Sequence, residues 1–197
     1  MNIVVANFKG GVGKTTTSVY LAAIAGSLGH DQVTLVDADR QASTAEWAEM
    51  RPLDGVEIVE APSTRTLTKA MNSDADIVVV DTPPNDEQIM RTALNLADKV
   101  VVPTRAGGVE FGPAQQTVDQ IPAGVACGVV ICAARLGTKD LEDALEWWPT
   151  EGKTPVWGII PERVAIATGP EAKLSYEGRA AYANVLAAVI KAKSRKK

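Results

Sequence analysis

The hydrophobic positions of this chain alternate between two patterns. Short runs rich in valine, isoleucine and leucine predict buried strands at residues 2–7, 32–37, 56–60, 76–81, 99–103, 125–132 and 156–160. Between them, apolar residues at helical spacing predict helices at residues 14–28, 42–50, 64–72, 87–97, 112–120, 138–147 and 176–193. Strands that alternate with helices favour a mostly parallel sheet covered on both faces. The pattern therefore predicts a single α/β domain over residues 1–197, with a twisted sheet of about seven strands flanked by helices.

A glycine-rich turn lies where the first predicted strand passes into the first predicted helix. It comprises Lys9, Gly10, Gly11, Val12, Gly13, Lys14, Thr15 and Thr16. Such a turn points several backbone N–H groups at one spot, and the helix N-terminus adds a partial positive charge. Lys14 brings a full charge to the outer phosphates of a nucleotide, and the Thr15 hydroxyl is suited to a magnesium ion. We therefore expect nucleotide binding at this turn.

The turn departs from the common phosphate-loop pattern G-x-x-x-x-G-K-[ST] at its first glycine, where Phe8 stands. A second lysine, Lys9, comes five residues before Lys14. Its place ahead of the glycines favours a reach across a two-fold interface over a contact with the nucleotide of its own chain.

Aspartates end two of the predicted strands. Asp37 and Asp39 follow the second strand, and Asp81 ends the fourth, ahead of Thr82 and Pro83. Ligands of parallel sheets bind beyond the carboxyl ends of the strands, so these residues are expected to converge on the glycine-rich turn. A carboxylate at the tip of an apolar strand is costly to desolvate without a cation, and a magnesium–phosphate site supplies one. For Asp39 a second interpretation stays open, in which it only caps a helix.

Composition narrows the class of protein. Apolar residues make up 46% of the 197 residues and charged residues 22%, as in a soluble globular protein. No apolar run reaches the roughly 20 residues of a membrane-spanning helix, and no basic start or cleavage site precedes the first strand, so we expect a cytoplasmic protein. Cys127 and Cys132 lie in an apolar strand, which favours core packing over a metal or redox site. The single histidine, His30, leaves almost no material for histidine-based catalysis.

Charge is unevenly distributed along the chain. The net charge is −4, yet residues 178–197 hold six basic residues and no acidic one. The tail over residues 191–197 carries Lys191, Lys193, Arg195, Lys196 and Lys197. This basic tail either complements the dipole of the last helix as a solvated end, or contacts nucleic acid or an anionic membrane.

The lysine-first turn at residues 9–16 resembles the deviant Walker A motif of the ParA/MinD family of P-loop ATPases. The resemblance implies binding of ATP and Mg²⁺, slow intrinsic hydrolysis, and an ATP-dependent homodimer in which Lys9 reaches the nucleotide of the opposite subunit. In the family's pattern Asp81 is the Walker B aspartate at the magnesium ion, and Asp37 belongs to the same metal site and positions the attacking water. The remaining residues of the aspartate motifs correspond to the switch that senses the γ-phosphate: Asp39, Thr82 and Pro83.

A later segment, residues 160–164, resembles the family's loop that packs on adenine. Pro161 matches the pattern, whereas Glu162 and Arg163 replace its arginine and asparagine. The resemblance implies nucleotide contacts by Pro161 and Arg163.

Within the family, the aspartate motifs at residues 37–41 and 81–84 resemble the ParA branch, which moves plasmids, chromosomes or other cargo over DNA; Arg40 departs from that branch's usual proline. This implies a partition ATPase whose ATP dimer binds DNA non-specifically, is stimulated by a ParB-like adaptor and is associated with the nucleoid. The basic tail is the candidate DNA contact. No N-terminal helix-turn-helix domain is expected, because Met1 nearly begins the first strand.

Two other interpretations remain open. A MinD-like membrane-cycling ATPase would need a C-terminal amphipathic helix, and residues 182–190 do carry an apolar stripe. That stripe is needed to cover the sheet, so a membrane partner is not expected. A metabolic P-loop enzyme of the dethiobiotin-synthetase type would use ATP on a small carboxylate or amine, and it would need a dedicated substrate pocket.

Overall fold

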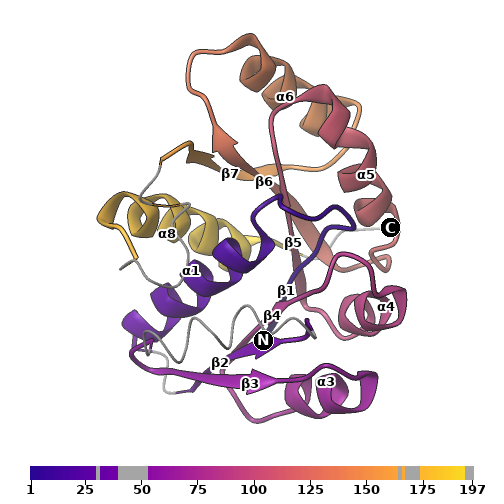
Figure 1. Ribbon diagram of the computed structural model, residues 1–197, viewed down its shortest axis with the longest axis vertical. Helices are drawn as coiled ribbons and strands as arrows, with labels where there is room; N and C mark the ends of the chain where they lie inside the picture. Colours follow the sequence, from indigo (N-terminus) through magenta and orange to yellow (C-terminus); the bar gives the residue numbers. More distant parts are fainter. Residues whose placement is uncertain (30–31, 40–52, 164–165, 167–173, 194–197) are drawn as a thin grey trace.

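A seven-stranded parallel sheet organises the chain (Figure 1). The computed structural model describes residues 1–29, 32–39, 53–163, 166 and 174–193. The strands are β1 (Asn2–Val5), β2 (Val33–Asp37), β3 (Val56–Glu60), β4 (Ile77–Asp81), β5 (Lys99–Thr104), β6 (Ala126–Ala134) and β7 (Val156–Pro161). Their order is β3-β2-β4-β1-β5-β6-β7, and every neighbouring pair is parallel. The predicted fold class is confirmed, with the sheet wholly parallel.

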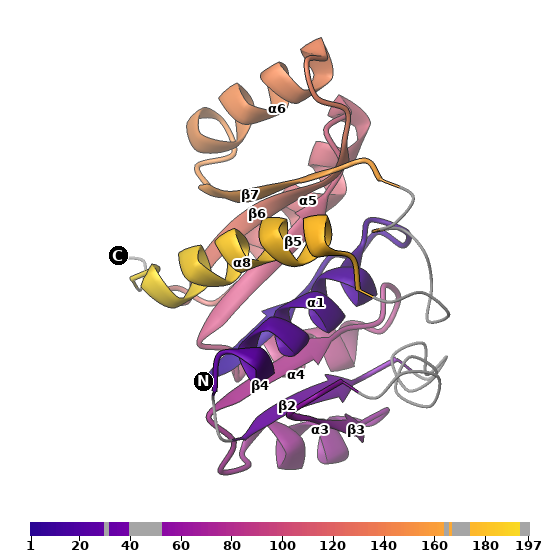
Figure 2. The same cartoon turned by 90° about the vertical axis from the view of Figure 1, so that its left-hand side faces the viewer.

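Helices cover both faces of the sheet (Figure 2). One face carries α1 (Lys14–Ser27) and α8 (Tyr176–Lys191). The other carries α3 (Thr64–Met71), α4 (Glu87–Asn95), α5 (Phe111–Asp119), which the short 3-10 helix η1 (Gly108–Glu110) precedes, and α6 (Lys139–Thr150). Successive strand residues point to opposite faces, so Val4 packs in one hydrophobic core while Ile3 and Val5 pack in the other.

The predicted elements agree with the described ones apart from some of their ends. β1 stops at Val5 because the chain then turns off the sheet, where Asn7 donates from Nδ2 to the Pro103 carbonyl at 2.8 Å. α6 runs to Thr150, past its predicted end, although Pro149 lies in its last turn. Trp148 beside it is fully buried, so packing outweighs the local cost of the proline. The helix predicted at residues 42–50 lies outside the described residues.

Side chains fix the starts of three helices. Ser63 and Thr66 form a reciprocal capping box at α3. Asp86 accepts hydrogen bonds from the N–H groups of the first turn of α4, and Ser175 accepts one from Gly178 N at α8. These caps satisfy donors that would otherwise have no partner, and they set where each helix leaves its loop.

α1, which follows the glycine-rich turn, is enclosed between the sheet and α8. The rings of Tyr20 and Tyr182 stack with centroids 4.8 Å apart. The close approach depends on Gly178 in the first turn of α8, since a Cβ there would lie 2.5 Å from the Tyr20 hydroxyl. The turn is therefore held on a helix that is packed on nearly all sides.

The C-terminal end of α8 lies at the amino ends of the strands, on the side of the sheet opposite the glycine-rich turn (Figure 2). Lys99, the first residue of β5, donates from Nζ to the Ala192 carbonyl just beyond α8, whereas the turn follows the carboxyl end of β1. Lys191 and Lys193 are exposed at this far edge. The other predicted tail residues, Arg195, Lys196 and Lys197, lie outside the described residues.

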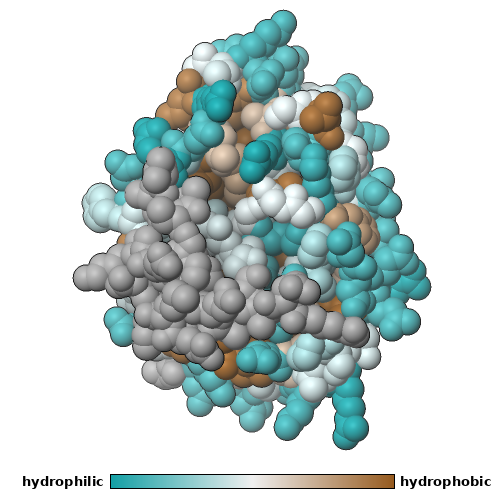
Figure 3. All heavy atoms as spheres, viewed as in Figure 1, coloured by the Kyte–Doolittle hydropathy of each residue, from teal (hydrophilic) through white to brown (hydrophobic). Residues whose placement is uncertain are grey.

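Hydrophobic side chains on the face shown in Figure 3 form separate spots among hydrophilic ones over its described part. Over the described residues as a whole, the most exposed large hydrophobic side chains come from different loops and helix ends: Leu28, Val109, Leu136 and Tyr176. No helix among the described residues combines the length and apolar character that crossing a bilayer requires.

Candidate functional site

The glycine-rich turn joins β1 to α1 in a backbone conformation that glycine adopts readily. Gly11 has φ 72° and Gly13 has φ 100°. A Cβ on Gly13 would also lie 3.3 Å from the Cys132 sulfur, so space as well as backbone angle favours glycine there. No side-chain hydrogen bond caps α1 at Gly13, as expected where the first N–H groups of a helix face a bound anion.

Two cavities flank the turn, and Gly11, Gly13 and Thr16 line both of them. The carboxylate-side cavity, of about 350 Å³, is lined by Gly10, Gly11, Gly13, Lys14, Thr15, Thr16, Asp39, Thr82 and Pro84. The β7-side cavity, of about 360 Å³, is lined by Gly11, Val12, Gly13, Thr16, Arg105, Cys132, Ala133, Ile160, Pro161, Glu162, Arg163, Ile166 and Tyr182. A nucleotide has the same division, with charged phosphates at one end and a flat, largely apolar base at the other. The shape and lining of the two cavities fit such a ligand.

Lys14 is the buried charge of the carboxylate-side cavity. Its side chain is 7% exposed, and Nζ donates to the Lys9 carbonyl at 2.9 Å. Burial lowers the pKa of Lys14 from its ordinary value, while the carboxylates of Asp81 and Asp39 act in the opposite direction. An ammonium group held in such a place is stabilised further by a polyanion at the turn.

Asp37 and Asp81 stand side by side at the carboxyl edge of the sheet. They are register partners in the adjacent strands β2 and β4, and each is at most 2% exposed. Asp37 Oδ1 accepts a hydrogen bond from Asp39 N at 3.0 Å, and Asp81 Oδ1 accepts one from the Ser18 hydroxyl at 3.2 Å. The predicted convergence of the two strand ends is thus present. Neither aspartate lines the carboxylate-side cavity, whose wall opposite the turn is formed by Asp39, Thr82 and Pro84.

This set of oxygen donors fits a magnesium ion. Mg²⁺ usually takes one or two carboxylates and completes its shell with water and substrate phosphates. Asp37, Asp81 and the Thr15 hydroxyl are the residues that would hold it. Among the residues that the structure describes, no group of three or more His, Cys, Asp or Glu side chains could hold a metal ion.

The predicted switch residues lie at different depths. Thr82 lines the carboxylate-side cavity and donates from Oγ1 to the Val5 carbonyl at 2.8 Å, which ties it to the end of β1. Asp39 lines the same cavity. Pro83 is buried behind it, and the next residue, Pro84, reaches the wall in its place.

The loop predicted to contact the base lines the β7-side cavity. Pro161 and Arg163 are both on its wall, and Arg163 Nε lies 3.4 Å from Glu177 Oε2. Glu162 pairs with Arg135 at 2.6 Å, and this arginine lowers the pKa of the Glu162 carboxyl. Both members of that pair are exposed, so the pair contributes little to stability.

Cys132 and Tyr182 line the β7-side cavity and are joined by the buried Thr17 hydroxyl behind them. The Thr17 hydroxyl lies 3.1 Å from the Tyr182 hydroxyl and 3.9 Å from the Cys132 sulfur. Burial raises the pKa of Cys132 to about 11 and that of Tyr182 well above its ordinary value. Both groups therefore stay neutral at physiological pH. Cys127 and Cys132 are free cysteines in the core strand β6, as predicted.

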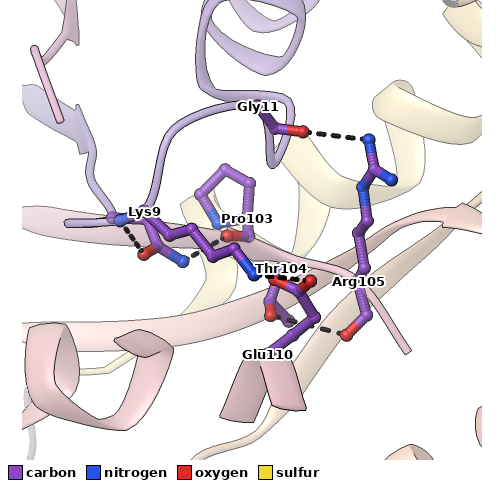
Figure 4. A network of polar contacts seen from close by, with 7 residues as sticks. Lys9, Gly11, Pro103, Thr104, Arg105 and Glu110 are labelled. Carbon is purple, nitrogen blue, oxygen red and sulfur yellow. Dashed lines mark hydrogen bonds and ion pairs between the residues drawn. The ribbon is translucent and has the colours of Figure 1, made fainter. Parts of the chain in front are cut away.

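Sequence reasoning assigned no role here to three polar residues in or next to the site. Ser18, one turn after Lys14, binds Asp81, and Arg105, just past β5, donates from Nη2 to the Gly11 carbonyl at 3.1 Å. Glu110 in η1 accepts a hydrogen bond from Lys9 Nζ at 2.8 Å (Figure 4). The rule that singled out the ends of β2 and β4 applies equally to the end of β5, and it would have found Arg105.

A sequence model of the CobQ/CobB/MinD/ParA nucleotide binding domain matches residues 3–176, a span that includes the turn and all three aspartates. The chain belongs to this family. The resemblance to MinD/ParA proteins inferred from the turn is confirmed, and nucleotide binding is the property that the family shares.

Individual MinD/ParA-type proteins show how widely the similarity extends. The chain is 34% identical over 149 residues to maintenance of carboxysome distribution protein A of Gloeobacter kilaueensis, which covers 73% of this chain and 67% of the relative. It is 29% identical, in an alignment 213 positions long, to the chromosome-partitioning ATPase Soj of Thermus thermophilus. The alignment covers 85% of this chain and 84% of the relative. The septum site-determining protein MinD of Pyrococcus horikoshii, solved with Mg-ADP, superposes with a TM-score of 0.78 at 18% identity, covering 96% of each chain. At that identity the superposition shows the shared fold.

Proposed function

We propose that this chain is a ParA-type ATPase that binds ATP with Mg²⁺, dimerises around the nucleotide and returns to single chains on hydrolysis. The observation that carries the proposal is the difference in exposure between the two lysines of the turn. Lys14 is buried over the turn, whereas the Lys9 side chain is 39% exposed at its rim. Lys9 at the rim can reach a phosphate bound to a second copy of the chain, while Lys14 still supplies the positive charge at the nucleotide of its own chain.

Positioning and charge neutralisation carry most of the catalysis in this proposal. Lys14 leaves the Lys9 carbonyl and binds the outer phosphates, together with the N–H groups of the turn. Asp37 orients the attacking water, and Lys9 of the partner subunit neutralises charge on the transferring group. The magnesium ion, when bound, neutralises phosphate charge and fixes the phosphate oxygens. Asp39, Thr82 and Pro83 sense the γ-phosphate, and Pro161 and Arg163 hold the base.

We further propose that the ATP dimer binds DNA non-specifically and that a ParB-like adaptor stimulates hydrolysis. The burial of the apolar stripe of α8 favours DNA, and not a membrane, as the surface that the dimer binds. Four of its members are buried against the sheet and cannot insert into lipid without unfolding the core: Tyr182, Val185, Leu186 and Val189. Of the stripe, Ile190 is 45% exposed. A single exposed isoleucine is too small an anchor for an amphipathic membrane helix.

The curated relatives are named for different cargoes, a carboxysome and a chromosome. The proposed cycle, in which the ATP dimer binds a surface and hydrolysis releases it, fits the transport of either kind of cargo. We therefore assign to this chain the transport of cargo over the nucleoid, with plasmid or chromosome segregation as its proposed role.

Lys9→Ala separates nucleotide binding from dimerisation. The variant should bind ATP as a single chain like the wild type, because Lys14 and the N–H groups of the turn are untouched, yet fail to dimerise or hydrolyse ATP. Fluorescent-nucleotide titration measures the first property, and light scattering with ATP and Mg²⁺ measures the second. Lys69→Ala, which removes the same charge from the exposed end of α3, is the matched control. A Lys9→Ala protein that still dimerises and turns over would support the metabolic alternative instead.

DNA binding should depend on both ATP and the basic tail. Replacing Lys191, Lys193, Arg195, Lys196 and Lys197 with alanine should weaken binding to plasmid DNA and flatten its salt dependence, since each lost phosphate contact removes about 0.9 from the slope on double-stranded DNA. ATP affinity should be unchanged. Retention on DNA at two salt concentrations is the measurement. Equal retention by the variant would mean that the tail is only a solvated helix end, and binding to anionic liposomes in place of DNA would favour the MinD-like alternative.

A further inference from the structure

Lys9 is held within its own chain by a dedicated acceptor. Its Nζ donates to Glu110 Oε1 at 2.8 Å, across 101 residues of sequence (Figure 4). The backbone of Lys9 is also fixed, since Lys9 N donates to Asn7 Oδ1 at 2.8 Å and the Asn7 side chain is tied to the end of β5. Lys9 therefore points along the segment after β5, and its ammonium group ends at η1.

The Glu110 carboxylate depends on this lysine. Its side chain is 13% exposed, and among the described residues its second oxygen, Oε2, is buried without a hydrogen-bond partner. A partly desolvated carboxylate with one unsatisfied oxygen is costly once its cation leaves. Departure of Lys9 from Glu110 thus costs free energy, because it leaves the Glu110 carboxylate without its cation.

Glu110 cannot easily follow the lysine. The next residue, Phe111, stacks on Trp147 with ring centroids 4.8 Å apart and meets Trp148 edge-on at 5.7 Å. Trp148 is fully buried in the core on that face of the sheet. The aromatic contacts anchor η1, so Lys9 must leave Glu110 behind if it is to reach beyond the rim of the turn.

We propose that Glu110 is a positioning residue that holds Lys9 in the single chain and so sets the ATP concentration at which two chains assemble. The inference rests on the proposed function, in which Lys9 contacts the nucleotide of the partner subunit. Because Glu110 competes with that nucleotide for one ammonium group, weakening the Lys9–Glu110 pair should favour the dimer. Glu110 acts through Lys9 and touches no part of the site's two cavities.

The test compares wild type, Glu110→Gln and Glu110→Ala in two titrations. Monomer ATP affinity comes from fluorescent nucleotide at a protein concentration too low for assembly, and the ATP concentration at half-dimerisation comes from light scattering. Both variants should bind ATP like the wild type and dimerise at about fivefold lower ATP, the upper end expected for a partly exposed ion pair. Glu146→Gln, which removes one exposed carboxylate from α6, controls for net charge.

Two further comparisons keep the outcome specific. In a Lys9→Ala background, Glu110→Gln should not restore dimerisation, and a double variant that assembles would show that Glu110 does not act through Lys9. If the wild type dimerises with ATP but the Glu110 variants assemble at the same or a higher ATP concentration, the positioning role is wrong and the proposed function stands. If the wild type itself never dimerises with ATP, the proposed function fails.

Discussion

Lys14→Ala should abolish nucleotide binding. Lys14 is the buried cation of the turn, and among the residues lining the carboxylate-side cavity no other side chain carries a positive charge. Truncating one member of a buried, hydrogen-bonded charge pair costs on the order of 2–5 kcal/mol, so the affinity for ATP should fall by at least about 30-fold. Fluorescent-nucleotide titration measures the loss, with Lys69→Ala as the charge-matched control on α3.

The fold should survive this substitution. Lys14 donates to the Lys9 carbonyl, and water can replace it because Gly10 and Gly11 of the turn are exposed. Circular dichroism and thermal melting should therefore resemble those of the wild type. Wild-type ATP affinity in a folded Lys14→Ala protein would refute the assignment of the turn as a phosphate site.

Asp37→Ala should bind ATP and Mg²⁺ yet hydrolyse ATP poorly. The substitution removes the carboxylate proposed to orient water. It leaves the turn and Lys14 to hold ATP, and Asp81, the Thr15 hydroxyl and the phosphates to hold Mg²⁺. Loss of a group that positions the nucleophile commonly costs 10²–10⁴-fold in rate, so we expect turnover to fall by at least about 100-fold. The ATP dimer should consequently accumulate, because hydrolysis is the step that returns it to single chains.

Single-turnover hydrolysis and light scattering with ATP measure these two effects. Asp37→Asn, which keeps the volume of a side chain that is 1% exposed, guards against an effect of the empty space left by alanine. Asp74→Asn removes the same charge at an exposed position near the opposite edge of the sheet and should change neither property. Normal hydrolysis by both Asp37 variants would remove Asp37 from the mechanism.

The strands and helices followed from local pattern because each has a strong periodic signal. β2 and β4 are short apolar runs that end in aspartate, and their parallel pairing brings Asp37 and Asp81 into register. The turn was equally visible, since its glycines and lysines are contiguous. Family membership and fold could therefore be predicted from the sequence.

What the sequence could not supply were contacts between distant segments. The Lys9–Glu110 pair joins the first turn to η1, and nothing local marks Glu110 as a partner for a lysine. Trp148 holds the last turn of α6 together through burial, which overrides the breaking signal of Pro149. In both cases the deciding contact joins segments that are far apart in the sequence, Lys9 with Glu110 and Trp148 with Phe111, and no short window of sequence contains both partners.

The placement of the two ends of α8 bears on how a dimer would meet DNA. The helix has 16 residues, about 24 Å of length at 1.5 Å per residue, and it carries its lysines at the edge away from the turn. If the proposed dimer joined two chains at their nucleotide ends with the two α8 axes in line, the Lys191 residues would lie roughly 50 Å apart, twice the length of one helix. At 3.4 Å per base pair, a duplex of fewer than about 15 base pairs could touch only one extremity. In the function proposed above, DNA affinity would therefore depend on the length of the duplex and not on its sequence.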